Sequence, residues 1–234
     1  ATFTLFRPFE FVRDDLCYQN LPVTIVGIGG GVTYSTLGST HHAQEDVAIA
    51  SAIPNMSVIA PCDPEETKAA TLWCVDQTRG PVYLRLGKAG EPDMTGKAID
   101  PFAFGKIRHL TKGKDVCILS YGPIMKMARE VAAKFHATGK TVSLVSVHTI
   151  KPLDVEGIGK ALKDHKQVVV IEEMAPRGGL CSQVKELAWD TKASCRLDTF
   201  ALQDAFIHNY GSHANLLSSH GLDLNTISAK LGLA

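Results

Sequence analysis

The sequence lacks the features that would assign it to several specialised classes of protein. No apolar run approaches the roughly 20 residues that span a bilayer. Lys and Arg number 24, as do Asp and Glu, so the net charge offers no general attraction to nucleic acid or to an anionic membrane surface. No signal-peptide pattern is present. We therefore predict a cytoplasmic protein that has neither nucleic acid nor a membrane as a partner.

Paired cysteines are also missing. The six cysteines are scattered and form no Cys-x-x-Cys pair, which argues against a zinc knuckle or a thioredoxin-like motif. Such single cysteines are expected to behave as small buried hydrophobes in a reducing compartment. His41 and His42 are adjacent and would point in different directions on a regular element, and no second cluster supplies further ligands. We predict no metal-ligating residue in this chain.

The sequence does contain strand-like apolar runs that alternate with helical patterns. Strands are predicted at residues 22–27, 56–60, 81–86, 115–120, 141–147, 167–171 and 196–200. Most of these runs are continuously apolar, as expected for strands covered on both faces by helices. Helices with an apolar stripe are predicted after Asp63, after Gly122 and after Gly179. The predicted fold class is α/β, with mostly parallel sheets flanked by helices.

Glycine and proline crowd the middle of the chain, between Leu86 and Lys114, which is typical of an interdomain linker. The chain has no initiator methionine and opens inside an apolar stretch, so we expect it to be a portion of a longer protein. We predict an N-terminally incomplete domain over residues 1–92, a linker over 93–113 and a second domain over 114–234.

The most distinctive stretch runs from Gly27 to Asp46, directly after a predicted strand. Its glycines do not form the dinucleotide fingerprint Gly-x-Gly-x-x-Gly, because Val32 and Tyr34 occupy the positions that would need glycine. It can be a surface loop whose histidines cap a helix that begins near Gln44. It can also be a ligand loop, since α/β folds place ligands after buried strands and histidine moves protons near neutral pH. The loop alone leaves both interpretations open.

In their order and spacing, motifs throughout the chain resemble the C-terminal part of the transketolase family. They lie at residues 3–11, 25–46 with a Gly-Ser-Thr-His core, 53–61, 81–87, 148–154 and 172–180. The resemblance implies a partial pyrimidine-binding domain followed by a transketolase C-terminal domain. It also implies an enzyme that uses thiamine diphosphate with Mg²⁺ to transfer a two-carbon ketol unit between sugar phosphates.

The same resemblance implies roles for single residues. Phe3, Phe6 and Phe9 would line the pocket of the cofactor's aminopyrimidine ring, because aromatic rings stack on a flat heterocycle and exclude water. His41 would contact the reacting oxygens of the sugar as the catalytic residue, and Arg85 would bind the acceptor phosphate. Without the family, the phenylalanines would be interpreted as core residues and Arg85 as a surface ion-pair residue.

Two positions depart from the pattern of many transketolases. Gly29 stands where another histidine is common, and Leu37 stands where an acidic residue is common. Leu37 cannot hydrogen-bond a sugar hydroxyl, so we expect a different sugar or a deoxy substrate.

The family's activating glutamate and its diphosphate and metal ligands match no residue of this chain. We therefore expect a partner, namely the missing N-terminal diphosphate-binding domain or a subunit that carries it, and a homodimeric assembly acting on sugar phosphates. Two alternatives within enzymes share the scaffold: a deoxyxylulose-phosphate synthase-like chain and the β subunit of a 2-oxoacid dehydrogenase. A third alternative is a non-catalytic chain that only mediates dimerisation.

Overall fold

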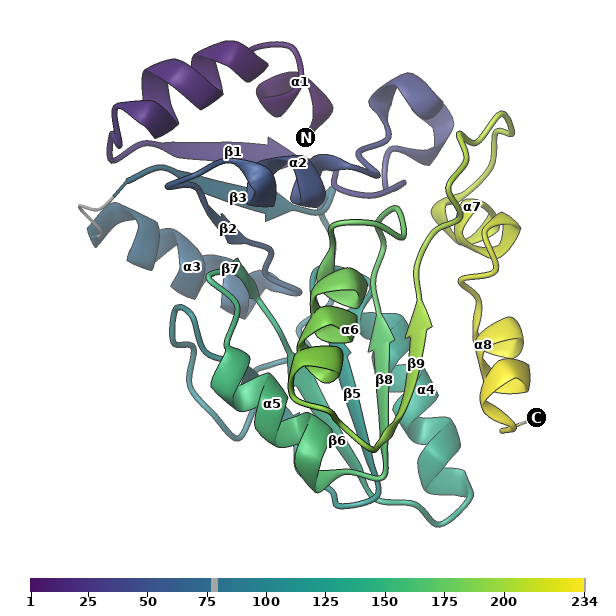
Figure 1. Ribbon diagram of the computed structural model, residues 1–234. Helices are drawn as coiled ribbons and strands as arrows, with labels where there is room; N and C mark the ends of the chain where they lie inside the picture. The colour runs from purple at the N-terminus through teal and green to yellow at the C-terminus, as the bar shows by residue number, and fades with distance from the viewer. Residues whose placement is uncertain (77–79, 234) are drawn as a thin grey trace.

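Two β-sheets, each flanked by helices, make up the fold (Figure 1). The computed structural model describes residues 1–76 and 80–233. The first sheet has the order β1-β3-β2-β7 and comprises β1 (Thr24–Ile28), β2 (Ser57–Ile59), β3 (Val82–Leu86) and β7 (Thr149–Lys151). The second has the order β4-β6-β5-β8-β9 and comprises β4 (Arg108–Thr111), β5 (Val116–Ser120), β6 (Val142–Ser146), β8 (Gln167–Ile171) and β9 (Arg196–Phe200). Among the strands of the described residues only β4 and β7 pair antiparallel, so the predicted mostly parallel α/β architecture is confirmed.

Every predicted strand is present, and β5, β6 and β8, which are largely apolar, are buried at each position. The two strands that were not predicted are short and lie at sheet edges. β4 has polar residues at most positions and falls inside the segment predicted as a linker, so part of that segment belongs to the second sheet. β7 pairs with β2, and the second half of the chain therefore contributes a strand to the first sheet.

Side chains cap the start of some of the helices and not of others. They are α1 (Thr2–Leu5), a π-helical segment (Phe11–Tyr18), 3₁₀ turns at Ser35–Leu37 and Ser39–His41, α2 (Asp46–Ala52), α3 (Pro64–Asp76), α4 (Met125–Ala137), α5 (Val155–Asp164), α6 (Leu180–Asp190), α7 (His213–Ser219) and α8 (Leu224–Leu231). The predicted helices correspond to α3, α4 and α6. Asp63 caps α3, since its Oδ1 accepts a hydrogen bond from the Glu66 amide at 2.8 Å. No helix within the described ranges is both long and apolar enough to cross a membrane.

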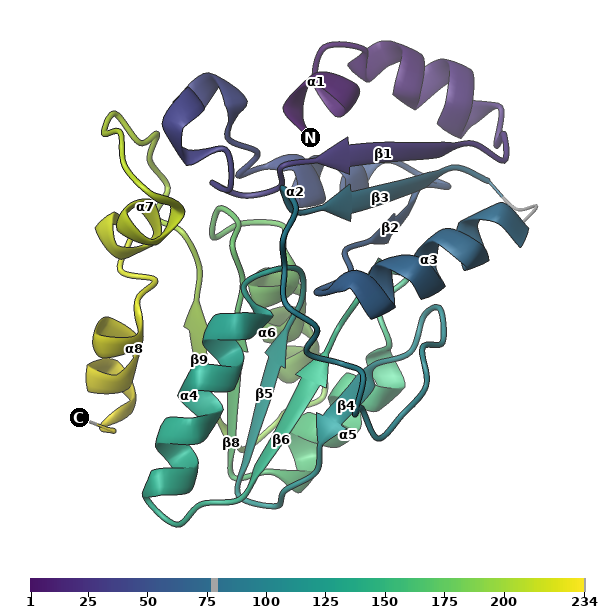
Figure 2. The same ribbon diagram turned by 180° about the vertical axis from the view of Figure 1, so that it is seen from behind.

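The helices sandwich both sheets. In the second sheet α5 and α6 cover one face, and α4 with α8 covers the other, as the two opposite views show (Figures 1 and 2). In the first sheet α1, the π-helical segment and α2 pack on one face, and α3 packs on the other. Five of the six cysteines are buried in these layers, and Cys195 is half-buried.

Loops from the two sheets meet at the carboxyl ends of their parallel strands. The loop after β1 contacts the segment after β8 through backbone and side-chain hydrogen bonds, among them Ala175 N to Gln44 O at 2.7 Å. The Gly122 amide, after β5, donates to Ala60 O at 3.1 Å. The carboxyl edge of parallel strands is where α/β folds bind ligands, so this junction is the place to look for a site.

One buried histidine at the junction predicts acid sensitivity. His148 is fully buried, stacks on Phe102 with 4.2 Å between ring centroids, and its Nε2 has no hydrogen-bond partner among the described residues. Burial, with a smaller contribution from the charge of Arg108, lowers the pKa of His148 from 6.5 to about 3. The unfolded chain therefore binds a proton at His148 that the folded chain does not, and stability is lost as pH falls below 6.5.

His148→Phe should remove this part of the acid sensitivity and keep the stack on Phe102. Between pH 7 and pH 5 the wild type should lose about 2 kcal/mol more unfolding free energy than the variant, measured by urea denaturation. Equal losses in both proteins would contradict the assignment.

Candidate functional site

The loop after β1 is closed at its base. Gly31 and Ala43 exchange two backbone hydrogen bonds, from Gly31 N to Ala43 O at 3.0 Å and from Ala43 N to Gly31 O at 2.8 Å. Residues 32–42 therefore project as one loop, which we call the histidine loop. Its tip is tied to the segment before α7 by a hydrogen bond from Ser39 Oγ to Ile207 O, and the two segments lie side by side in Figures 1 and 2.

His41 lies on the 3₁₀ turn at the end of the histidine loop and is partly exposed. Its Nδ1 is 3.1 Å from Thr40 Oγ1. Its ring stands edge-on to Phe3, with 5.2 Å between centroids and 85° between planes. The fold thus brings together the predicted catalytic histidine and one of the predicted cofactor aromatics, which belong to different elements.

A cavity of about 300 Å³ opens beside Phe3, and His42 rather than His41 is among its lining residues. It is lined by Thr2, Phe3, Phe6, Arg7, Ser39, Thr40, His42, Glu45 and Phe206. Two of the three predicted aromatics, Phe3 and Phe6, therefore share the cavity. Phe9 is not among its lining residues and is 36% exposed.

Arg85 occupies a different environment from the one expected. It is 3% exposed, and its Nε donates to Asp46 Oδ2 at 2.8 Å, while its Nη2 donates to Ala43 O and Glu173 O. Burial alone would lower the pKa of Arg85, but the adjacent Asp46 carboxylate raises it above the usual value. Tyr83 also donates its hydroxyl to Asp46 Oδ2 at 2.8 Å. Arg85 is thus a buried residue of an internal ion pair with Asp46, whereas without the family a surface ion pair was expected.

His42 also differs from the expectation of a surface loop or a capping role. It is 3% exposed, and neither of its ring nitrogens has a hydrogen-bond partner within the described part of the chain. Burial lowers the pKa of His42, an effect opposed in part by the backbone of Ser35 and, less strongly, by the charge of Glu173. α2 begins at Asp46, and Glu45 at its N-cap makes no capping hydrogen bond with its side chain. The histidines therefore do not cap this helix. His41 is partly exposed and His42 is buried, so the two neighbouring side chains lie in different environments.

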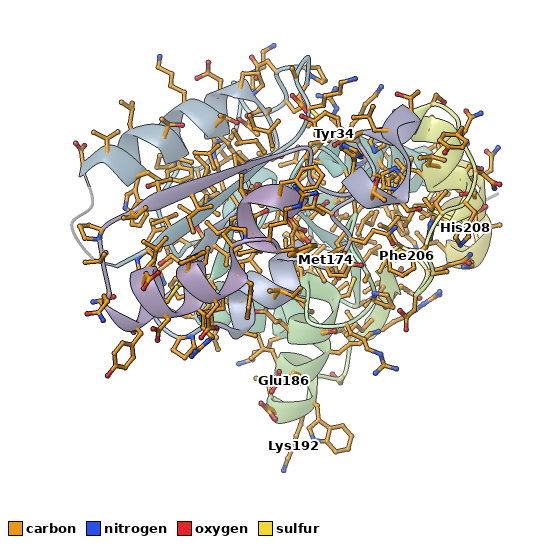
Figure 3. The ribbon with its side chains drawn as sticks, turned by 90° about the horizontal axis from the view of Figure 1, so that it is seen from above. Tyr34, Met174, Glu186, Lys192, Phe206 and His208 are labelled. Atoms are coloured by element: carbon orange, nitrogen blue, oxygen red, sulfur yellow. The ribbon has the colours of Figure 1, made fainter. Side chains whose placement is uncertain are left out.

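The two departures from the family pattern have structural correlates. Gly29 has a φ of 82°, and a Cβ at this position would collide with the ring of Tyr34. A histidine cannot stand there unless Tyr34 moves. Leu37 is 51% exposed and lines a cavity of about 210 Å³ with polar residues of the 207–210 segment. Figure 3 shows the molecule from above and labels Tyr34 in the histidine loop and Phe206 and His208 in the segment before α7.

Sequence reasoning missed several polar residues at the junction of the two sheets. A cavity of about 580 Å³ between the histidine loop and α4 is lined by residues that include Lys88, Glu91 and His213. Lys88 lies two residues after the end of β3 and could have been found by the rule that ligands bind after parallel strands. Glu173 was only part of a family motif. Its Oε1 is 2.8 Å from His213 Nε2 and accepts the Val32 amide at 2.7 Å.

Residues 1–76 and 80–233 contain no group of three or more His, Cys, Asp or Glu side chains that could hold a metal ion. The candidate site consists of His41, the cavity that Phe3 and Phe6 line, and the histidine loop.

Two family profiles together match nearly the whole chain. The transketolase pyrimidine-binding domain profile matches residues 1–91, and the transketolase C-terminal domain profile matches residues 105–227. Over 223 residues the chain is 32% identical to one of the subunits of the apulose-4-phosphate transketolase of Phocaeicola vulgatus, a match that covers 95% of this chain and 70% of that relative.

A solved split-gene transketolase, an inactive β4 tetramer, superimposes with a TM-score of 0.84 at 30% identity, over 98% of this chain and 72% of that one. The chain is also 30% identical over 226 residues to 1-deoxy-D-xylulose-5-phosphate synthase of Chlorobaculum tepidum, covering 96% of this chain and 35% of that enzyme.

Proposed function

The chain belongs to the transketolase family, and from this premise we propose that it supplies the pyrimidine pocket and the substrate-contacting histidine of an enzyme that transfers a two-carbon ketol unit between sugar phosphates. The observation that carries the proposal is the position of His41, edge-on to Phe3 beside the cavity that Phe6 also lines. An imidazole in this position can donate a hydrogen bond to a carbonyl or hydroxyl oxygen of the sugar and stabilise the charge that develops there.

The cavity fits the aromatic end of the cofactor. Its aromatic walls, Phe3 and Phe6, can enclose a flat pyrimidine ring and keep water from it. Thiamine diphosphate, when bound, supplies the carbon nucleophile that accepts the two-carbon unit. The part played by this chain is to hold the pyrimidine end and to place His41 over the sugar oxygens.

The diphosphate and its Mg²⁺ require residues from elsewhere in the assembly. We infer a second subunit or domain that carries these ligands, and a homodimeric, cytoplasmic enzyme built from both. Two findings support a second kind of subunit: one relative is named as a single subunit of its transketolase, and the β4 tetramer of a split-gene transketolase is described as inactive. The decisive assay mixes the chain with such a subunit and measures ketol transfer from a ketose phosphate to an aldose phosphate. Absence of transfer by the mixture would contradict the proposal.

A deoxyxylulose-phosphate synthase-like activity is a second candidate. It is supported by the relatives of that name and by the exposed, apolar Leu37 at the tip of the histidine loop, which cannot bind a hydroxyl. Supplying pyruvate in place of the ketose phosphate in the same assay would separate the two activities.

The isolated chain should bind thiamine diphosphate weakly, because the negatively charged diphosphate normally requires a divalent ion and its oxygen ligands. Titration calorimetry with the cofactor and Mg²⁺ should give no binding at micromolar concentrations. The partner subunit, added to the same cell, should restore the heat of binding. Micromolar affinity of the chain alone would show that the diphosphate ligands are present in it.

A further inference from the structure

The acidic pair after β8 includes a buried carboxylate to which the proposed function gives no role. Glu173 is 2% exposed, and its Oε1 accepts a hydrogen bond from the Val32 amide at 2.7 Å. The two residues are 141 positions apart in the chain. Val32 is the first residue of the histidine loop, so a side chain of the second half of the protein holds the start of the loop that carries His41.

The main chain around Glu173 holds the other end of the same loop. Arg85 Nη2 donates to Glu173 O at 3.2 Å and to Ala43 O at 3.3 Å. The Ala175 amide donates to Gln44 O at 2.7 Å. Residues 173–175 therefore contact both ends of the loop base, and we call this set of contacts the loop clamp.

The loop backbone is shaped to fit the carboxylate. Gly31 has a φ of 67°, and a Cβ at this position would collide with Glu173 Oε1. Positive φ and the absence of a side chain are both needed for this close approach. On its other side the carboxylate meets His213 Nε2 at 2.8 Å, and His213 begins α7.

The hydrogen bonds of Glu173 are strong enough to affect the position of the histidine loop. A hydrogen bond to an ionised, buried acceptor is roughly twice as strong as a neutral one, and loss of the acceptor leaves the Val32 amide without its partner. The loop sits on no regular element between Gly31 and Asp46 except short 3₁₀ turns, so its position depends on such tertiary contacts.

We propose that Glu173 is a positioning residue: through the Val32 amide it fixes the base of the histidine loop and thereby sets the place of His41 against Phe3. The structural role of Glu173 is independent of the proposed function, and only the expected effect on catalysis rests on it. A displacement of about 1 Å of a reacting group can lower turnover roughly 10²-fold. The second half of the chain would then act on catalysis without contacting the substrate.

The first test needs no activity. Hydrogen exchange of the full chain should show the amides of residues 32–43 exchanging at least tenfold faster in Glu173→Ala. In Glu173→Gln the rise should be about threefold, because the amide oxygen can still accept from Val32 in a weaker, neutral bond. Glu186→Ala, at an exposed site on α6, is the matched control and should leave the loop unchanged. Unchanged exchange in a folded Glu173→Ala would overturn the proposal, and Glu173→Gln decides in the same way if the alanine variant does not fold.

The second test uses the reconstituted enzyme. Glu173→Ala should lower kcat by about 10- to 100-fold with KM within threefold, and Glu173→Gln should recover most of the rate. Faster loop exchange with an unimpaired kcat would overturn the proposed link to catalysis. If the wild-type assembly transfers no ketol unit, the proposed function fails, and the exchange data still decide whether Glu173 holds the loop.

Discussion

His41→Ala in the reconstituted enzyme should slow ketol transfer by roughly 10²–10⁴-fold, the range typical of losing a general acid–base group. The side chain is partly exposed on a 3₁₀ turn, and its contacts are with Thr40 and Phe3, so its removal should disturb little packing. Steady-state kinetics measure the effect, and a thermal melt checks that the fold survives.

Two other histidines serve as controls. His136→Ala, at an exposed position on α4, should change neither turnover nor melting temperature. His42→Ala removes a buried ring and should lower the melting temperature, with a smaller effect on turnover than His41→Ala. If His42→Ala proved more damaging to turnover at an unchanged melting temperature, the roles of the two histidines would have to be exchanged.

Asp46→Ala should destabilise the protein by about 3–5 kcal/mol, because it leaves the buried Arg85 guanidinium without its counter-charge. The carboxylate is fully buried and binds both Arg85 Nε and the Tyr83 hydroxyl through Oδ2. Urea denaturation at neutral pH measures the loss of unfolding free energy. The exposed pair of Glu10 and Arg13 supplies the control, since Glu10→Ala should leave the unfolding free energy nearly unchanged.

Arg85→Ala gives the complementary measurement. If Arg85 serves the buried ion pair, its truncation should lower the unfolding free energy of the protein. The change in kinetics should then be the same for phosphorylated and unphosphorylated acceptors. Unchanged stability, together with a raised KM for phosphorylated acceptors only, would instead restore the role that the family resemblance implied for Arg85.

The sequence by itself determined the layers of this protein. Largely apolar runs specify β5, β6 and β8 because strands covered on both faces bury their side chains at every position. The cap at Asp63 specifies the start of α3 through a contact only three residues long. Motif order was sufficient to assign the family, which profiles of both domains and the relatives confirm. Each of these signals is a short stretch of residues or the order of such stretches, so the linear sequence is sufficient to recognise it.

Only the tertiary structure decided how the site residues are used. His41 and His42 are chemically identical neighbours, and packing leaves one at the surface beside Phe3 and buries the other. Arg85 became internal because Asp46, which is 39 positions away, compensates its charge in the core. Glu173 reaches Val32 across 141 residues. Desolvation and ion pairing depend on which residues from distant parts of the chain come into contact. No local pattern in the sequence specifies those contacts.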